Sequence, residues 1–286
     1  MTGKPDLIAC YWTLCGPIAG FFDDDTSPRD FRDRVEAAAR AGFTGIGLKD
    51  NDIARIRERY GFPDMARILA DNGIRHVEIE ALFDWFTAGE RRQASDATRR
   101  ILLEAAEHLA PHRVKVVGDF VDIDAPIDPM LPHFTKLCRD FADVSDARVA
   151  VEVIPFSNVR DIATGLRLVR AGDAGNAGLM LDIWHVVRGG ISFDEIAAIP
   201  RGLIAGVELD DAAAEMQGDM LNDTLYHRKL CGEGDFDIPG FLKAIERAGY
   251  DGPIGVEVIS REQMTLPLDE AARRLYDTTI RWFETI

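Results

Sequence analysis

The feature of this sequence that most constrains its fold is a regular alternation of short β-rich runs with helical segments. Runs rich in Val, Ile and Leu recur along the chain, and the segments between them carry apolar residues at the spacing of a helix that packs on a sheet. The expected strands are residues 7–12, 44–48, 76–81, 113–117, 149–154, 178–183, 204–209 and 253–259.

Eight β-α units in 286 residues, with no Pro/Ser/Gly-rich linker between them, predict one α/β domain over residues 1–286. Its predicted architecture is a single (β/α)8 TIM barrel with its active site at the C-terminal mouth. The alternative is a doubly wound open sheet. That fold normally carries G-x-G-x-x-G after an early strand, and neither "CGPIAG" nor "GLKDND" has this spacing.

The segment "SPRDFRDRVEAAARAG" shows the expected helix signals. Ser27 is predicted to cap the helix, with Pro28 in the first turn, Asp30 completing an S-x-x-D box and Gly42 ending the helix. Helices are also expected after strands three, five, seven and eight, in "SDATRRILLEAAEHLA", "NVRDIATGLRLVRAG", "DIPGFLKAIERAG" and "LDEAARRLYDTTIRWF".

Composition excludes several classes of partner. The formal charge of −16 and a pI near 4.8 argue against nucleic acid or an anionic membrane surface as a partner. The four cysteines form no C-x-x-C pair, which predicts free thiols. Without a signal-like or membrane-spanning segment, the expected location is the cytoplasm.

Ionisable residues stand between branched apolar residues near the ends of several expected strands. If the apolar neighbours face the helices, the charged side chains face the barrel lumen. Four carboxylates then come from strands five to eight, namely Glu152, Asp182, Glu208 and Glu257.

Four carboxylates that converge in a partly dry site repel one another unless a cation holds them. Oxygen ligands favour Mn²⁺ or Mg²⁺, with Co²⁺ or Zn²⁺ as alternatives. The other interpretation, which stays open at this stage, is a metal-free ion network with Lys115, Lys49 or Arg228.

Three further residues are predicted to bind substrate. His185 follows Asp182 as D-x-x-H, Lys115 lies in the lumen of strand four, and Arg228 lies in the long connection 210–237. An exposed Arg on a solvated loop is the alternative for Arg228. Gly232 and Gly234 would let the backbone come close to a ligand. Trp12, at the end of strand one, is either a wall of the pocket or part of the core.

The motifs "VAVEVIPF", "LMLDIWH", "AGVELDDA" and "HRKLCGEGDFDIPGFLKAIERAGYDGPIGVEVIS" resemble the xylose isomerase-like TIM barrels, the sugar phosphate isomerase/epimerase superfamily. That group includes inosose isomerase, inosose dehydratase, D-tagatose 3-epimerase, hydroxypyruvate isomerase and 3-dehydroshikimate dehydratase. The resemblance implies that Glu152, Asp182 and Glu257 bind a divalent metal and that Glu152 and Glu257 also act as acid and base. It places His185 and Arg228 at substrate oxygens.

Glu208 departs from the family's usual pattern, which has His or Gln at this position in strand seven. Glu208 is expected to replace that ligand and to complete an all-carboxylate metal site. The alternative is that Glu208 points away and leaves the metal with three protein ligands.

The expected activity is isomerisation or epimerisation of a sugar, sugar phosphate or cyclitol through a metal-stabilised enediolate. The alternative is a metal-dependent dehydratase or lyase on a keto-cyclitol, 3-keto-sugar or dehydroshikimate-like substrate. Phosphodiester cleavage, as in the related AP endonuclease IV group, would need more zinc-binding histidines. A sugar-binding barrel without turnover would not need paired Glu152 and Glu257. The resemblance also suggests a homodimer or homotetramer.

Overall fold

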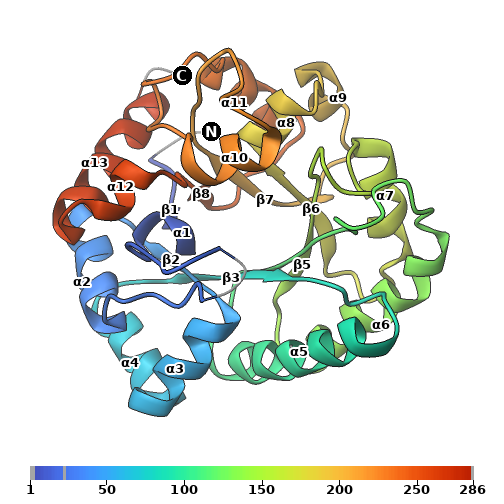
Figure 1. Ribbon diagram of the computed structural model, residues 1–286, viewed down its shortest axis with the longest axis horizontal. Coiled ribbons are helices and arrows are strands. Elements are labelled where there is room, and N and C mark those ends of the chain that lie inside the picture. Colours follow the sequence, from blue (N-terminus) through green and yellow to red (C-terminus); the bar gives the residue numbers. More distant parts are fainter. Residues whose placement is uncertain (1–3, 22–23, 285–286) are drawn as a thin grey trace.

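The computed structural model describes residues 4–21 and 24–284, which form a closed barrel of parallel strands surrounded by helices (Figure 1). Each strand pairs with its neighbour in sequence order, and β8 closes the barrel on β1. This confirms the predicted TIM barrel and excludes the open sheet. The strands are β1 Leu7–Ala9, β2 Gly45–Leu48, β3 His76–Leu82, β4 Arg113–Val116, β5 Arg148–Glu152, β6 Ala177–Asp182, β7 Ile204–Leu209 and β8 Ile254–Val256.

Helices fill the connections between the strands, and the longer ones form the outer layer (Figure 1). The 3₁₀ turns are η1 Asp128–Met130 and η2 Arg281–Phe283. The α-helices are α1 Tyr11–Leu14, α2 Phe31–Ala41, α3 Asp50–Tyr60, α4 Phe62–Asp71, α5 Gly89–Leu109, α6 Leu131–Ala142, α7 Ile162–Ala171, α8 Ile183–Arg188, α9 Phe193–Ala197, α10 Met220–Tyr226, α11 Ile238–Arg247, α12 Arg261–Thr265 and α13 Leu268–Ile280.

Side chains alternate between the helix layer and the lumen along the strands, as the sequence pattern predicts. Val151, Val207 and Val256 belong to one large hydrophobic core together with helix residues such as Leu168 and Phe241. The charged residues that directly follow these valines, Glu152, Glu208 and Glu257, lie outside this core and face the lumen. The barrel interior is therefore polar toward the mouth, where the strands end.

Two strands, β1 and β8, are shorter than predicted by at least three residues. β1 stops at Ala9 because the chain turns into α1, so Trp12 lies on a helix rather than at a strand end. The Thr13 hydroxyl of α1 donates a 2.6 Å hydrogen bond to the Val256 carbonyl, which ties this turn to the end of β8. Glu257 lies just beyond β8, with its N–H bonded to the Leu209 carbonyl at 3.0 Å.

Ser27, the predicted N-cap of α2, lies about one turn before the residue that caps this helix in the structure. Asp30 is the N-cap of α2, and its carboxylate accepts the Arg32 N–H at 2.9 Å. Ser27 instead donates to the Cys15 carbonyl at 2.6 Å, so its hydroxyl organises the loop before the helix. Gly42 ends α2 with φ of 111°, as predicted.

The described residues bear on two predictions made from composition. All four cysteines are free and buried, as their spacing predicts. Within residues 4–21 and 24–284, the helices are too short or too polar to traverse a lipid bilayer.

Gly255 of β8 leaves room for side chains that reach across the lumen. A Cβ at this position would lie 2.6 Å from Glu208 Cγ and 2.8 Å from Cys10 Sγ, far closer than normal contacts. The glycine therefore leaves room for the Glu208 side chain in the lumen beside β8.

Gly255→Ala should lower the free energy of unfolding by about 1–3 kcal/mol, because a well-packed interior resists an added methyl group. Thermal or urea unfolding measures this loss. Removing the thiol in Cys10→Ala/Gly255→Ala should restore part of the stability. An unchanged midpoint for Gly255→Ala would mean that Glu208 does not fill the lumen beside it.

Candidate active site

Four carboxylates meet at the C-terminal mouth of the barrel. One oxygen from each of Glu152, Asp182, Glu208 and Glu257 lies within 4.8 Å of the others. All four residues are at most 5% exposed. We refer to these four residues as the mouth cluster. The structure thus brings together the carboxylates that the sequence proposed as metal ligands.

Asp182 ends β6 and caps the helix that follows. Its Oδ1 accepts the N–H groups of Trp184 and His185 at 2.7 and 3.2 Å, while Oδ2 lies 2.6 Å from Arg228 Nη1. Because α8 begins directly after the strand, the D-x-x-H spacing places His185 on its first turn, facing the lumen rim.

Arg228 is a buried part of the site rather than a solvated loop residue. Its Nη1 contacts Asp182 at 2.6 Å, Asp210 at 2.5 Å and Glu257 at 3.2 Å. Its other nitrogens donate to the Thr224 hydroxyl at 2.8 and 3.2 Å. The guanidinium therefore clamps the ends of β6, β7 and β8 to the long connection after β7.

Lys115 reaches across the lumen from β4. Its Nζ lies 2.6 Å from Glu80, 2.8 Å from Glu257 and 2.9 Å from Glu208. An ammonium has three N–H donors, and each of these carboxylates can accept one. The predicted substrate-binding role of Lys115 stays a prediction, since its side chain is only 2% exposed.

Glu152 is the carboxylate of the mouth cluster with the weakest protein partner. His185 Nε2 lies 3.6 Å from its Oε1. Burial raises the pKa of Glu152 to about 7, Lys115 opposes this rise, and Glu257 adds to it. Burial and the nearby Arg228 charge hold the pKa of His185 well below its usual value, so the imidazole is neutral.

The mouth holds far more acidic than basic side chains. Burial raises the pKa of Glu80 to about 8, and it raises the pKa values of Glu208 and Asp210 well above the usual range. Lys115 and Arg228 are the only cations that contact the carboxyl groups of the mouth within the described residues. The carboxyl groups are Glu80, Glu152, Asp182, Glu208, Asp210 and Glu257.

These residues fit a divalent metal. Glu208 Oε2 is buried and has no hydrogen-bond partner in the part of the chain that the structure describes. An unpaired carboxylate oxygen at the centre of an acidic cluster is costly unless it binds a proton or a cation. The oxygen-rich donor set suits a hard divalent ion, and the structure does not select among Mn²⁺, Mg²⁺, Co²⁺ and Zn²⁺.

The ion network that the sequence left as an alternative is also present in part. Lys115 and Arg228 pair with mouth carboxylates, but Lys49 pairs with Asp25 at 3.1 Å and Asp50 at 2.6 Å instead. The network and a metal are not exclusive, because two cations cannot balance all of the acidic groups.

Gly232 and Gly234, in the loop after β7, make contacts within that loop. Asp211 accepts the N–H groups of Gly232, Gly234 and Phe236 at 2.8 to 3.0 Å. A Cβ on Gly234 would lie 2.3 Å from the Ala212 carbonyl oxygen. The close approach that Gly234 permits is therefore to the neighbouring backbone, and it fixes the segment that carries Arg228.

Aromatic rings line one side of the mouth. Phe83, Phe120 and Phe156 follow β3, β4 and β5, with ring centroids 5.8 Å apart for the first pair and 5.5 Å for the second. Phe156 also lies 6.0 Å from the His185 ring. These half-buried rings form an apolar wall that continues to the imidazole beside Glu152.

Several residues of the site were not assigned from sequence. Glu80 follows the same alternation as the assigned carboxylates, so the V-E-I-E run was a usable signal. Asp210 lies two residues after Glu208 and was readable as a partner for Arg228. Cys10 and Phe156 carry no sequence signal of their own, because their roles depend on strands that lie across the barrel.

Comparison with known proteins shows that the chain matches the model of one protein family. The family model described as "Xylose isomerase-like TIM barrel" matches residues 35–286. The chain is 28% identical over 232 residues to 3-dehydroshikimate dehydratase of Pseudomonas aeruginosa (strain ATCC 15692 / PAO1), covering 80% of this chain and 36% of that protein. The chain thus spans about a third of the length of this relative.

Two further matches differ in what their names describe. The inosose isomerase of Halalkalibacterium halodurans is 26% identical over 135 residues, covering 46% of this chain and 47% of that protein. The crystal structure of the IOLI protein with a binding zinc atom superimposes with a TM-score of 0.82 at 17% identity, covering 98% of both chains. At this identity the structural match supports the fold alone.

The excess of buried carboxyl groups predicts how stability depends on pH. A folded-state pKa of about 8 for Glu80, against an ordinary value of 4.5, means that the folded state binds this proton more tightly than the unfolded state. Its contribution to stability is fully present below about pH 4.5 and is lost as pH rises through about 8. The Tm of metal-free protein should therefore fall by an amount on the order of 5 °C between pH 5.5 and 8.5.

The Glu80→Gln variant should flatten this dependence, whereas Glu107→Gln on the exposed face of α5 should leave it unchanged. Thermal unfolding with a chelator present measures both. A Tm of the native protein that rises steadily over this range would contradict the assignment of trapped protons to the mouth.

Proposed function

The chain belongs to the xylose isomerase-like TIM barrel family, and we propose that it is a divalent-metal-dependent enzyme that moves a proton next to a substrate carbonyl. The substrate class is a small polyhydroxylated carbonyl compound, such as a sugar, sugar phosphate or cyclitol. The observation that carries this proposal is the mouth cluster, whose four carboxylates offer oxygens within 4.8 Å of one another at the end of the barrel where such enzymes work.

Glu152, Asp182, Glu208 and Glu257 would hold the metal. Arg228 and the helix-cap hydrogen bonds fix Asp182, and Lys115 and Arg228 fix Glu257, so two of the ligands are preorganised. A divalent ion bound there would supply positive charge to the substrate's carbonyl oxygen and thereby make the neighbouring C–H more acidic.

Two carboxylates of the cluster are suited to proton transfer. In the metal-free site, burial raises the pKa of Glu152 to about 7. Its side chain has only a weak partner, His185 at 3.6 Å, so it is the carboxylate least held by the protein and the one we assign to proton transfer. Glu257 lies at the end of a different strand and is the second acid or base. Neutral His185, 3.6 Å from Glu152, can bond a substrate hydroxyl and keep it oriented.

The fate of the proton decides the reaction. Return to the opposite face of the same carbon gives an epimer, and return to the neighbouring carbon gives an aldose-ketose isomer. This is the activity that we propose first, and the similarity to inosose isomerase supports it.

Dehydration is the second candidate. Loss of a hydroxyl group after the same proton removal would make the protein a dehydratase. The specific observation in its favour is the 28% identity with 3-dehydroshikimate dehydratase over 80% of this chain. The first chemical step and its residues are the same in both candidates.

Solvent deuterium exchange tests the shared step. The native protein should exchange a carbon-bound proton of at least one member of a panel of ketoses, inososes and 3-dehydroshikimate, read by NMR, only when Mn²⁺, Mg²⁺, Co²⁺ or Zn²⁺ is present. Glu152→Gln and Glu257→Gln should each lower the exchange rate at least ~100-fold, because general acid-base catalysis contributes this much.

The matched control is Glu107→Gln, which removes an exposed carboxylate and should exchange like the native protein. Water loss from 3-dehydroshikimate, followed by the ultraviolet absorption of a conjugated product, separates the second candidate from the first. Exchange that survives in both glutamine variants, or that needs no divalent ion, would refute the proposal.

A further inference from the structure

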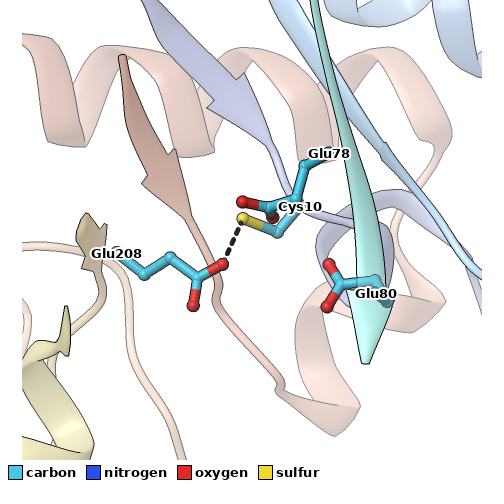
Figure 2. Close-up of side chains that lie close together, drawn as sticks. All are labelled: Cys10, Glu78, Glu80 and Glu208. Carbon is cyan, nitrogen blue, oxygen red and sulfur yellow. Dashed lines mark hydrogen bonds between the residues drawn. The ribbon is translucent and has the colours of Figure 1, made fainter. Parts of the chain in front are cut away.

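A second group of metal-ligand side chains lies beside the mouth cluster. Cys10, Glu78, Glu80 and Glu208 offer ligand atoms that lie within 4.8 Å of one another, and we refer to these four residues as the inner cluster. Figure 2 shows them converging from the segment after β1, from β3 and from β7, with the Cys10 thiol hydrogen-bonded to Glu208 Oε1 at 3.1 Å. Glu208 belongs to both clusters.

The inner cluster already contains positive charge. Lys115 Nζ contacts Glu80 at 2.6 Å and Glu208 at 2.9 Å, and Arg113 from the same strand pairs with Glu78. Both basic side chains are at most 2% exposed. Every carboxylate of the inner cluster is therefore paired with a buried cation, whereas Glu152 of the mouth cluster pairs with neither Lys115 nor Arg228 among the described residues.

We propose that Lys115 is the resident cation of the inner cluster and that it restricts the chain to one divalent ion, at the mouth cluster. A divalent ion bound by Glu80 and Glu208 Oε1 would have to displace the ammonium from both carboxylates, because like charges in a dry site repel strongly. An ion at the mouth can instead be held by Glu152 and by Glu208 Oε2, which do not pair with Lys115 in the described part of the chain. This inference rests on the proposed metal site, because it assigns Lys115 a part in shaping that site.

Lys115 also positions two mouth-cluster ligands. It binds Glu208 Oε1 together with Cys10, so that Oε2 is the oxygen without a protein partner. It binds Glu257 Oε1 at 2.8 Å, while Arg228 contacts Oε2. Lys115 is thus a positioning residue whose two hydrogen bonds, to Glu208 and Glu257, and whose ion pair with Glu80 join the two clusters.

Metal stoichiometry and the Co²⁺ spectrum test this role without any assay of activity. The native protein should bind one Co²⁺ per chain and show no thiolate-to-cobalt charge-transfer absorption, since Cys10 lies only in the inner cluster. Lys115→Met should bind a second Co²⁺, with that absorption, because a freed inner cluster offers a thiol and three carboxylates.

Two matched variants complete the design. Lys115→Met/Cys10→Ala should lose the charge-transfer absorption, and Lys115→Arg, which keeps a cation in the lumen, should bind one ion as the native protein does. A Lys115→Met variant that still binds a single ion without the absorption would overturn the proposal.

If Lys115→Met cannot be obtained folded, the metal stoichiometry and the Co²⁺ spectrum of the native protein test the proposal. Two bound ions per native chain, or a charge-transfer absorption in the native protein, would overturn the proposal, whereas one ion without this absorption supports the proposal.

A native protein that binds no divalent ion would refute the proposed function separately. In that case, the appearance of an ion and the absorption in Lys115→Met would still support Lys115 as the resident cation.

Discussion

The site depends on an imbalance of buried charge at the barrel mouth. Carboxyl groups at β3, β6, β7 and β8 contact two cations, Lys115 and Arg228. Glu152 of β5 joins this cluster but pairs with neither cation among the described residues. The same imbalance raises the pKa values of Glu80 and Glu152 and leaves an oxygen of Glu208 without a partner. A divalent ion would relieve all three effects, which is why we regard metal binding as the condition for an ionised site.

Much of the fold could be predicted from the sequence because its signals are local. Alternation of apolar and charged residues in β5 to β8 indicates which side chains face the lumen, and the regular β-α spacing indicates a barrel. The strand ends were less predictable. Trp12 is a residue type that favours strands, yet it lies in α1. The chain turns there, where Thr13 of α1 is hydrogen-bonded to the end of β8.

The partners of the site residues could not be predicted in the same way. Lys115 contacts carboxylates from β3, β7 and β8, and those pairings depend on the stagger of strands across the barrel. Arg228 was proposed from its place in a long connection and from the family resemblance. Its burial among Asp182, Asp210 and Glu257, however, depends on how that connection folds back over the mouth. Nothing in the local sequence encodes such contacts.

The relatives indicate where chemistry can diverge on this scaffold. Proteins named as a dehydratase and as an isomerase both match the chain, so similarity to this family does not by itself fix the product. The wall formed by Phe83, Phe120 and Phe156 lies on connections after β3, β4 and β5, beside His185. Under the proposed function, these connections would contact a substrate bound beside Glu152 and would set which face of its ring Glu152 meets.

Calorimetric titration of metal-free protein with Mn²⁺ at pH 7, in two buffers of different ionisation enthalpy, tests the central claim most directly. The account predicts one ion bound per chain, together with net release of protons, because raised-pKa carboxyl groups must ionise to bind the metal. Asp182→Asn should weaken this binding. The absence of binding in the native protein, or binding without proton release, would contradict the account.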